Sequence, residues 1–387
     1  MTTPATPANS DRGSQFLSIQ ALRFIAALAV VVLHSTFYTM ERLHSSTSVY
    51  DVGANGVRLF FVISGFVMII SSQKLLNTQR GWSVFAFKRI VRIVPIYWAI
   101  TLIKVAVLLV TPAVVLHSEL DWGYILKSFF FIPEYNVDGE IRPLLGVGWT
   151  LNFEMFFYLL FALALACRVR PIRFIAPVLI VMSALSLIKT PDWPVVAYFL
   201  CDPIVIDFLA GMLIAHWVQR GWTGPSQAAA WAAAGVGLIY LFVPGVPRAE
   251  YGTMFASLIT TLAAGSVIIG AVGIEKSIGR RIPQWMVYMG AASYSLYLVH
   301  PMVSPAAPAL FAKIGLTGGF MAWLAVVTAV AVAMGAAVLV YRYGEVPFTK
   351  WLNRRVRDAG LFDTGPRSRS LPATLAAPLR ERSQSEE

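Results

Sequence analysis

The sequence is much more apolar and much less charged than that of a soluble domain. Of its 387 residues, 57% are hydrophobic and only 13% are charged, whereas about 25% of the residues in soluble domains are charged. The mean hydropathy is +0.67. This composition excludes a soluble enzyme, a disordered protein and a fibrous protein. It predicts an all-α protein that crosses a membrane repeatedly.

Apolar stretches that suit membrane crossing recur along the whole chain. A spanning helix needs about 20 mostly apolar residues, and ten stretches come close to that length. The fold class that we predict is therefore a polytopic transmembrane helix bundle of about ten spans. In chain order, the predicted spans cover residues 17–38, 55–72, 90–110, 148–167, 174–189, 197–218, 228–243, 252–274, 285–303 and 319–341.

The basic residues predict the orientation of these spans. Lys and Arg near the ends of transmembrane helices favour the cytoplasmic side. With the N-terminus inside, every predicted cytoplasmic segment is basic, as at 74–89, 168–173 and 276–281. We therefore expect both termini in the cytoplasm and a multi-pass protein of the cell inner membrane. The net charge of +11 then reflects topology, and we expect no binding to nucleic acid.

The distribution of apolar residues predicts one transmembrane domain between two tails. The domain covers 17–352, after a disordered N-terminal tail at 1–16 and before a disordered cytoplasmic C-terminal tail at 353–387. The C-terminal tail mixes Arg with Ser, Pro and Ala, a composition typical of solvated, unfolded chain. The two cysteines fall on opposite sides of the predicted membrane, so we expect no disulfide.

Three ionisable side chains are predicted to lie at a similar depth near the outer face. His34, Glu154 and His300 fall near the outer ends of the first, fourth and ninth predicted spans. Ionisable groups within spans are costly and often mark function, so these residues predict the wall of a polar cavity. A histidine beside a carboxylate can act as a general base. Structural hydrogen bonding between helices is the alternative interpretation for each residue.

Three further polar residues are candidates for the same cavity. Asp207 lies in the middle of the sixth predicted span, where helix packing is an equally good interpretation. Ser64 lies in a Ser-Gly-Phe sequence that suits close helix packing first and ligand approach second. Tyr158 is the remaining candidate. The sequence contains no His, Cys or carboxylate spacing typical of a metal site, so we expect no metal.

The predicted inner face is rich in arginine. Arg89 and Arg92 follow Lys88 at the start of the third predicted span, and their spacing of three residues places them on one helix face. Arg23 lies toward the cytoplasmic end of the first predicted span. These residues suit plain anchoring at the inner face. They also suit a clamp for an anionic ligand such as a phosphate, because guanidinium groups bind phosphate well.

Seven sequence blocks, in order along the chain, resemble those of the acyltransferase-3 family of integral membrane acyltransferases. The short, single-domain form is similar to the exopolysaccharide O-acetyltransferase branch. One position departs from the pattern, since Arg58 stands where the family usually has an acidic residue. The blocks are Ala21 to Ala27 with His34, Gly56 to Phe66, Lys88 to Trp98, Gly148 to Tyr158, Phe208 to Met212, Ser293 to Pro301, and Glu345 to Phe348.

The resemblance implies an O-acyltransferase with acyl-CoA as donor, by family default acetyl-CoA, and a saccharide hydroxyl as acceptor. The residues that match family motifs by position are Arg23, His34, Arg89, Arg92 and Glu154. We expect the arginines to bind the CoA nucleotide at the inner face. The pantetheine arm would then reach His34, about 16 Å from Arg23 on the same helix face. His34, oriented by Glu154, would act as a general base or as a transient acyl carrier.

Two other classes of protein share parts of this pattern. A proton-coupled secondary transporter could use His34, Glu154 and His300 as a proton relay, although transporters often have two related halves and none is visible. A polysaccharide polymerase or flippase is also polytopic and basic, but its reaction needs no cytoplasmic nucleotide clamp. The sequence leaves open the acceptor sugar, which is extracytoplasmic or lipid-linked, the acyl chain length, the oxyanion donor and the oligomeric state.

Overall fold

Helices make up most of the part of the chain that the structure describes. The computed structural model describes residues 16–44, 48–76, 78–111, 119–248 and 253–358. Within these residues, the extended backbone pairs only in an isolated bridge between Tyr135 and Ile141. The predicted all-helical class is therefore confirmed.

Six helical segments are long and apolar enough to cross a membrane. Helices suit this environment because hydrocarbon offers no partner for backbone N–H and C=O groups, which an α-helix satisfies internally. The protein is therefore a multi-pass membrane protein. The α-helices of these segments are α1 (Leu17–Leu43), α2 (Asn55–Ser71), α3 (Gly81–Val110), α5 (Trp149–Ala166), α10 (Met254–Ile278) and α14 (Gly319–Val340).

The other predicted spans correspond to shorter helices. The predicted ninth span is interrupted at Ala292. Just before this break, α11 packs closely on α1, since a Cβ on Gly290 would lie 1.9 Å from the carbonyl oxygen of Gln20. The shorter helices of this group are α6 (Pro171–Leu185), α7 (Val195–Leu200), α8 (Ile206–Gln219), α9 (Gln227–Phe242), α11 (Gln284–Ala291) and α12 (Ser293–Val303).

Helix α3 begins earlier than the sequence predicts. Its first residue is Gly81 rather than residue 90. The added turns are held in the core by Phe85, whose ring stacks on that of Phe161 at 4.6 Å. Arg89 and Arg92 therefore lie well inside a continuous helix. The sequence had predicted them at the start of this helix, and that prediction was wrong.

Helices α2 and α8 cross in direct backbone contact. A Cβ on Gly211 would lie 1.9 Å from the carbonyl oxygen of Val62, and one on Gly65 would lie 2.1 Å from that of Phe208. Glycine is needed at both positions because any side chain would force the helices apart. This crossing fixes the position of α2, which carries Arg58 and Ser64.

A buried ion pair joins the same helices to α10. Arg58 Nε lies 2.6 Å from Asp207 Oδ2, and Arg58 Nη2 lies 3.1 Å from Asp207 Oδ1. Ser257 and Thr261 of α10 accept hydrogen bonds from the same guanidinium. Asp207 is thus the partner of the residue that departs from the family pattern. It does not line the cavity described below, because α8 turns this side chain toward α2 and α10.

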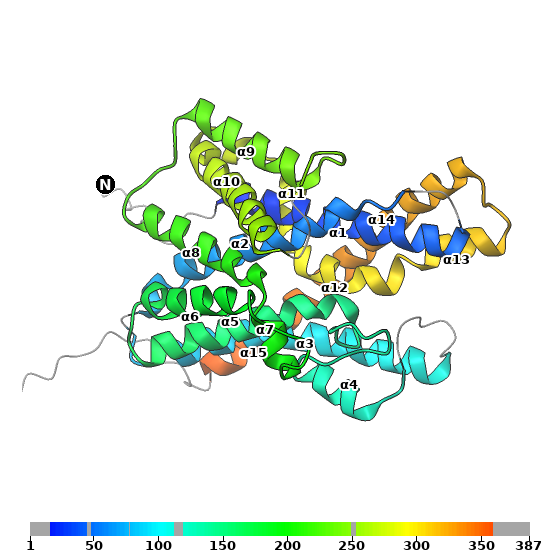
Figure 1. The fold of residues 1–387 in the computed structure, drawn as a ribbon, viewed down its shortest axis with the longest axis horizontal. Helices are drawn as coiled ribbons and strands as arrows, with labels where there is room; N and C mark the ends of the chain where they lie inside the picture. Colours follow the sequence, from blue (N-terminus) through cyan, green and yellow to red (C-terminus); the bar gives the residue numbers. More distant parts are fainter. Residues whose placement is uncertain (1–15, 45–47, 77, 112–118, 249–252, 359–387) are drawn as a thin grey trace, which may run out of the picture.

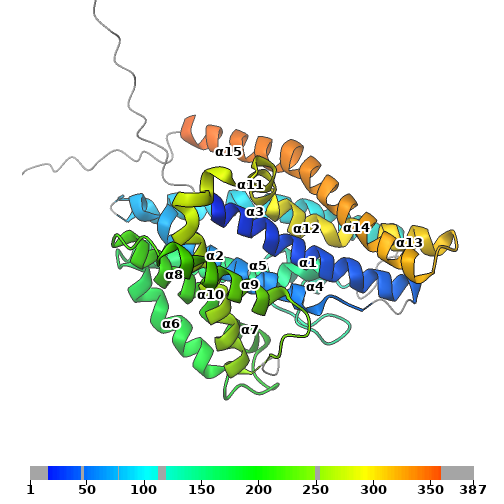
Figure 2. The ribbon, with the colours of Figure 1, turned by 90° about the horizontal axis from the view of Figure 1, so that it is seen from above.

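The helices lie side by side in three groups (Figure 1). Helices α9 and α10 lie on one side, α3, α5 and α6 lie on the other, and α1, α2, α12 and α14 lie between them. Turned by 90°, the structure shows α14 leading into α15 (Val346–Asp358) at one edge (Figure 2). The two small helices α4 (Trp122–Phe129) and α13 (Ala306–Lys313) lie toward the right in Figure 1.

The predicted C-terminal tail begins inside a helix. Helix α15 continues to Asp358, past the predicted boundary at 353, because the half-buried Leu352 and Val356 extend its packed face. The predicted N-terminal tail, and the C-terminal tail after Asp358, lie outside the described residues.

Candidate active site

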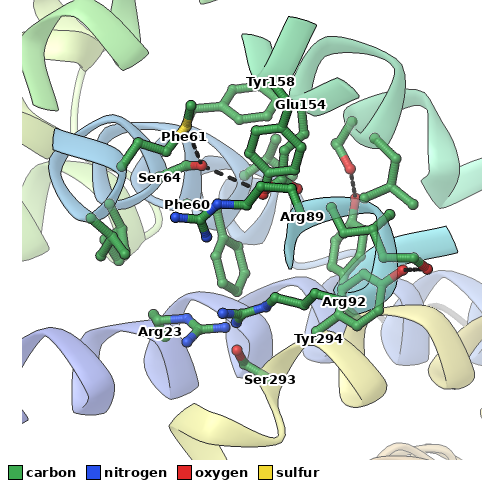
Figure 3. A pocket seen from close by; sticks show the side chains of 18 residues that line it. Arg23, Phe60, Phe61, Ser64, Arg89, Arg92, Glu154, Tyr158, Ser293 and Tyr294 are labelled. Atoms are coloured by element: carbon green, nitrogen blue, oxygen red, sulfur yellow. Dashed lines mark hydrogen bonds between the residues drawn. The ribbon is translucent and has the colours of Figure 1, made fainter. Parts of the chain in front are cut away.

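A cavity lies between α1, α2, α3, α5 and α12, and Figure 3 shows the 18 residues that line it. Its charged residues are Arg23 of α1, Arg89 and Arg92 of α3, and Glu154 of α5. We call it the arginine cavity. The fold therefore brings to one place three arginines from distant parts of the sequence.

Arg89 is held in place by its neighbours. Its Nη2 donates to Ser71 Oγ at 2.8 Å. Its guanidinium also lies over two aromatic rings, 5.3 Å from the centre of Phe85 and 5.5 Å from the centre of Tyr158. Aromatic faces attract cations, so the guanidinium is fixed without a ligand.

Glu154 lies beside Arg89, on the side of the cavity away from Arg23 and Arg92 (Figure 3). Its Oε1 accepts a hydrogen bond from the hydroxyl of Tyr158 at 2.5 Å and a weak one from Ser64 at 3.4 Å. Glu154 and Tyr158 are one helical turn apart and share a face of α5. Ser64 and Tyr158, both predicted as cavity candidates, therefore meet at the Glu154 carboxylate.

A second carboxylate, that of Glu345, interacts electrostatically with Arg23 and Arg92. Glu345 is only 8% exposed and accepts a hydrogen bond from Ser295 at 2.6 Å. From the sequence, Glu345 was identified only as part of a family block, because it lies just beyond the last predicted span. An acid directly after a predicted span was the available signal.

One hydroxyl in the cavity has no hydrogen-bond partner. Ser293 is fully buried, lines the cavity and lies next to Arg23 and Arg92 in Figure 3. Buried hydroxyls in native proteins are nearly always hydrogen-bonded. An unpaired hydroxyl beside two guanidinium groups therefore indicates a place for a ligand with acceptor oxygens.

His34 and His300 form a contact outside the lining of this cavity. His300 Nε2 lies 3.3 Å from His34 Nδ1, and the ring centres are 5.0 Å apart. His34 Nδ1 also lies 2.9 Å from the carbonyl oxygen of Val30. The structure thus brings together two of the three residues predicted to share an outer layer.

Glu154 does not join the two histidines. The prediction measured depth from the expected ends of the spans, but α1 continues to Leu43, beyond the predicted end at 38. His34 therefore lies farther from the end of its helix than expected. The partners of Glu154 in the structure are Ser64 and Tyr158. The expected orientation of His34 by Glu154 is corrected accordingly.

Aromatic side chains separate the arginine cavity from the histidine pair. Tyr297 and Phe60 both line the cavity, with ring centres 6.1 Å apart. The Tyr297 ring also lies 5.9 Å from that of His300. Its hydroxyl donates to the Val147 carbonyl at 3.0 Å and accepts from Thr150 at 3.1 Å. We call Phe60 and Tyr297 the aromatic wall.

Among the residues that the structure describes, no group of three or more His, Cys, Asp or Glu side chains could bind a metal ion. The site instead has guanidinium groups in the arginine cavity and two imidazole rings beyond the aromatic wall. This arrangement suits an anionic ligand and a proton acceptor.

Comparison with known proteins identifies the family. The acyltransferase domain of the acyltransferase-3 family matches residues 16–342. The chain belongs to this family. It is also similar to the exopolysaccharide production protein ExoZ of Rhizobium meliloti (strain 1021), with 33% identity over 322 residues. That match covers 81% of this chain and 94% of ExoZ. No solved structure matches the chain.

Membership of the acyltransferase-3 family establishes a membrane acyltransferase and confirms the resemblance noted in the sequence. The matched region contains α1 to α14, and so includes the arginine cavity and both histidines. The family thus accounts for an acyl donor.

Proposed function

We propose that this protein moves an acyl group, most simply acetyl, from cytoplasmic acyl-CoA to a hydroxyl of an extracytoplasmic or lipid-linked saccharide. It would do so in the cell inner membrane with both termini in the cytoplasm. The observation that carries the proposal is the arginine cavity, where Arg23, Arg89 and Arg92 meet beside the unpaired hydroxyl of Ser293. Similarity to ExoZ supports an acceptor from exopolysaccharide synthesis.

The arginines suit the nucleotide end of CoA. That end carries several phosphate charges, and guanidinium groups bind phosphate through paired, charge-assisted hydrogen bonds. Glu154 and Glu345 balance part of the positive charge while the cavity is empty.

His34 is the proposed base. Its distance from Arg23 along α1 is about 16 Å, a length that suits the pantetheine arm. The acceptor oxygen would attack the thioester carbonyl as its proton passes to His34 Nε2. The C–S bond would then break, and the proton would pass to the CoA sulfur. A transient acyl-histidine is the alternative course. In either case the aromatic wall lies on the path of the arm.

The direct test uses membrane vesicles and acetyl-CoA labelled in the acetyl group. We expect label in saccharide with the wild-type protein and almost none with His34→Ala, because loss of a general base lowers rates by about 10²–10⁴-fold. Glycan acetylation at the wild-type rate by His34→Ala would refute the role of His34. A wild-type protein that transports glycan without label transfer would instead favour the flippase interpretation.

A further inference from the structure

His300 is buried in the protein interior with its ring directed at His34. It is 0% exposed, and its Nε2 lies 3.3 Å from His34 Nδ1. We propose that His300 is the positioning residue of the transferase. It accepts a hydrogen bond from His34 Nδ1 and thereby directs the lone pair of His34 Nε2 toward the acceptor hydroxyl. This inference rests on the proposed role of His34 as the base.

The backbone around His300 fixes its tautomer. His300 Nδ1 lies 3.2 Å from the carbonyl oxygen of Leu296, which can only accept a hydrogen bond, so Nδ1 carries the proton. The carbonyl of Tyr297 also interacts with this ring. That carbonyl is available because Pro301, four residues later, has no N–H to donate. Neutral imidazole has a single N–H, and His300 Nε2 is therefore an acceptor.

The tautomer of His34 follows from that of His300. His34 Nδ1 faces two acceptors, the carbonyl oxygen of Val30 at 2.9 Å and His300 Nε2 at 3.3 Å. A nitrogen between two acceptors must carry a proton. The lone pair of His34 is thus on Nε2, the nitrogen that a general base needs. Both acceptors also stabilise the imidazolium that forms when Nε2 takes a proton.

This arrangement differs from a histidine–carboxylate pair. The other aromatic rings beside the pair are that of Tyr38, 6.2 Å from the His34 ring, and that of Tyr297, 5.9 Å from the His300 ring. A neutral acceptor keeps the resting pair uncharged inside the membrane, where a charge is costly. His300 does not change protonation during the reaction. It orients His34 and disperses the charge that His34 acquires.

The test compares two replacements of His300 in the full-length protein. His300→Phe keeps the ring shape but removes the acceptor, and we expect kcat to fall about 10- to 100-fold while the KM for acetyl-CoA stays within about twofold. His300→Gln keeps an acceptor at the position of Nε2, and we expect it to retain most of the activity that His300→Phe loses. Equal kcat for wild type and His300→Phe would overturn the proposal, as would equal losses in the two folded variants.

A double-mutant cycle with His34→Ala separates positioning from general damage. If His300 acts only through His34, then His300→Phe lowers kcat in the wild-type background but not in His34→Ala. Additive losses would mean that His300 acts through packing. If His300→Phe fails to fold, His300→Leu, which also lacks the acceptor, completes the cycle. A fully active His34→Ala would instead refute the role of His34 as the general base. Failure of the proposed function can therefore be distinguished from failure of the role of His300.

Discussion

At the residue scale, the arginines of the cavity can be distinguished from basic residues that only anchor the helix. Arg89 and Lys88 are adjacent on α3, but Arg89 lines the cavity while Lys88 is exposed. Replacing Arg89 or Arg92 with Lys keeps the charge and removes the planar fork that pairs with phosphate. We expect each change to raise the KM for acetyl-CoA about tenfold, since a charge-assisted hydrogen bond contributes about 1.5–3 kcal/mol.

Lys88→Ala is the matched control for that experiment. It removes a neighbouring charge outside the cavity, and we expect its KM to equal that of the wild type. Steady-state kinetics in vesicles with varied acetyl-CoA measure both values. If Arg89→Lys leaves the KM unchanged, or if Lys88→Ala raises it equally, the arginines serve topology alone.

The Arg58–Asp207 pair is a structural element of the same helices. Asp207→Asn leaves the Arg58 guanidinium buried without a counter-charge, which costs about 3–5 kcal/mol when a buried pair is broken. We therefore expect a clear fall in the melting temperature of the detergent-solubilised protein. Replacing both residues with Leu should recover much of that loss, because apolar pairs can replace buried ion pairs. An unchanged melting temperature for Asp207→Asn would show that the pair contributes little.

At the element scale, the start of α1 is held by a side chain from another helix. Glu275 of α10 accepts hydrogen bonds from the backbone N–H groups of Leu17 and Ser18, both at 2.9 Å. It also accepts one from the Ser18 hydroxyl. The first N–H groups of a helix have no partner within that helix, and an anion near them is further stabilised by the helix dipole.

This contact makes a prediction about local opening. Glu275→Ala should expose the first amides of α1 and destabilise the helix start by about 1–2 kcal/mol. Hydrogen exchange read by mass spectrometry should then speed up in the peptide that begins α1. Lys276→Ala, one residue along α10, is the control and should leave that exchange rate unchanged. Equal protection in both variants would argue against the cap.

The elements also show which features sequence patterns can predict. Hydrophobic stretches predicted the positions of α1, α2, α5, α10 and α14, because burial in hydrocarbon requires long apolar helices. The same patterns missed the early start of α3, where Phe85 and Phe161 extend the helix through packing. They also missed the break at Ala292, because the apolar run continues through it.

The candidate site was predictable only in part. The arginines that line one cavity were grouped correctly, since spacing along α3 and depth along α1 are local properties. The neighbour of Glu154 was not predictable, because the rotation of α5 about its axis decides which wall its carboxylate faces. Contact between His34 and His300 required both the depth of α12 and its packing against α1.

At the scale of the whole molecule, the predicted topology can be tested with a native thiol. Cys167 follows α5 and is exposed, whereas Cys201 is buried. If the N-terminus is cytoplasmic, Cys167 lies at the cytoplasmic end of α5. In a Cys201→Ala background, a membrane-impermeant maleimide should label Cys167 in inside-out vesicles but not in intact spheroplasts. The reverse labelling pattern would invert the proposed orientation and place the arginine cavity on the wrong side for cytoplasmic acyl-CoA.

The central claim is that one ligand extends from the arginine cavity to His34. The most direct measurement is an experimental structure of the full-length protein with a non-hydrolysable acetyl-CoA analogue. We predict phosphate groups in contact with Arg23, Arg89 and Arg92, an arm that passes Phe60 and Tyr297 as their side chains move, and the acyl carbon next to His34 Nε2. An analogue bound elsewhere, or bound at the arginines with its acyl group directed away from His34, would contradict the account.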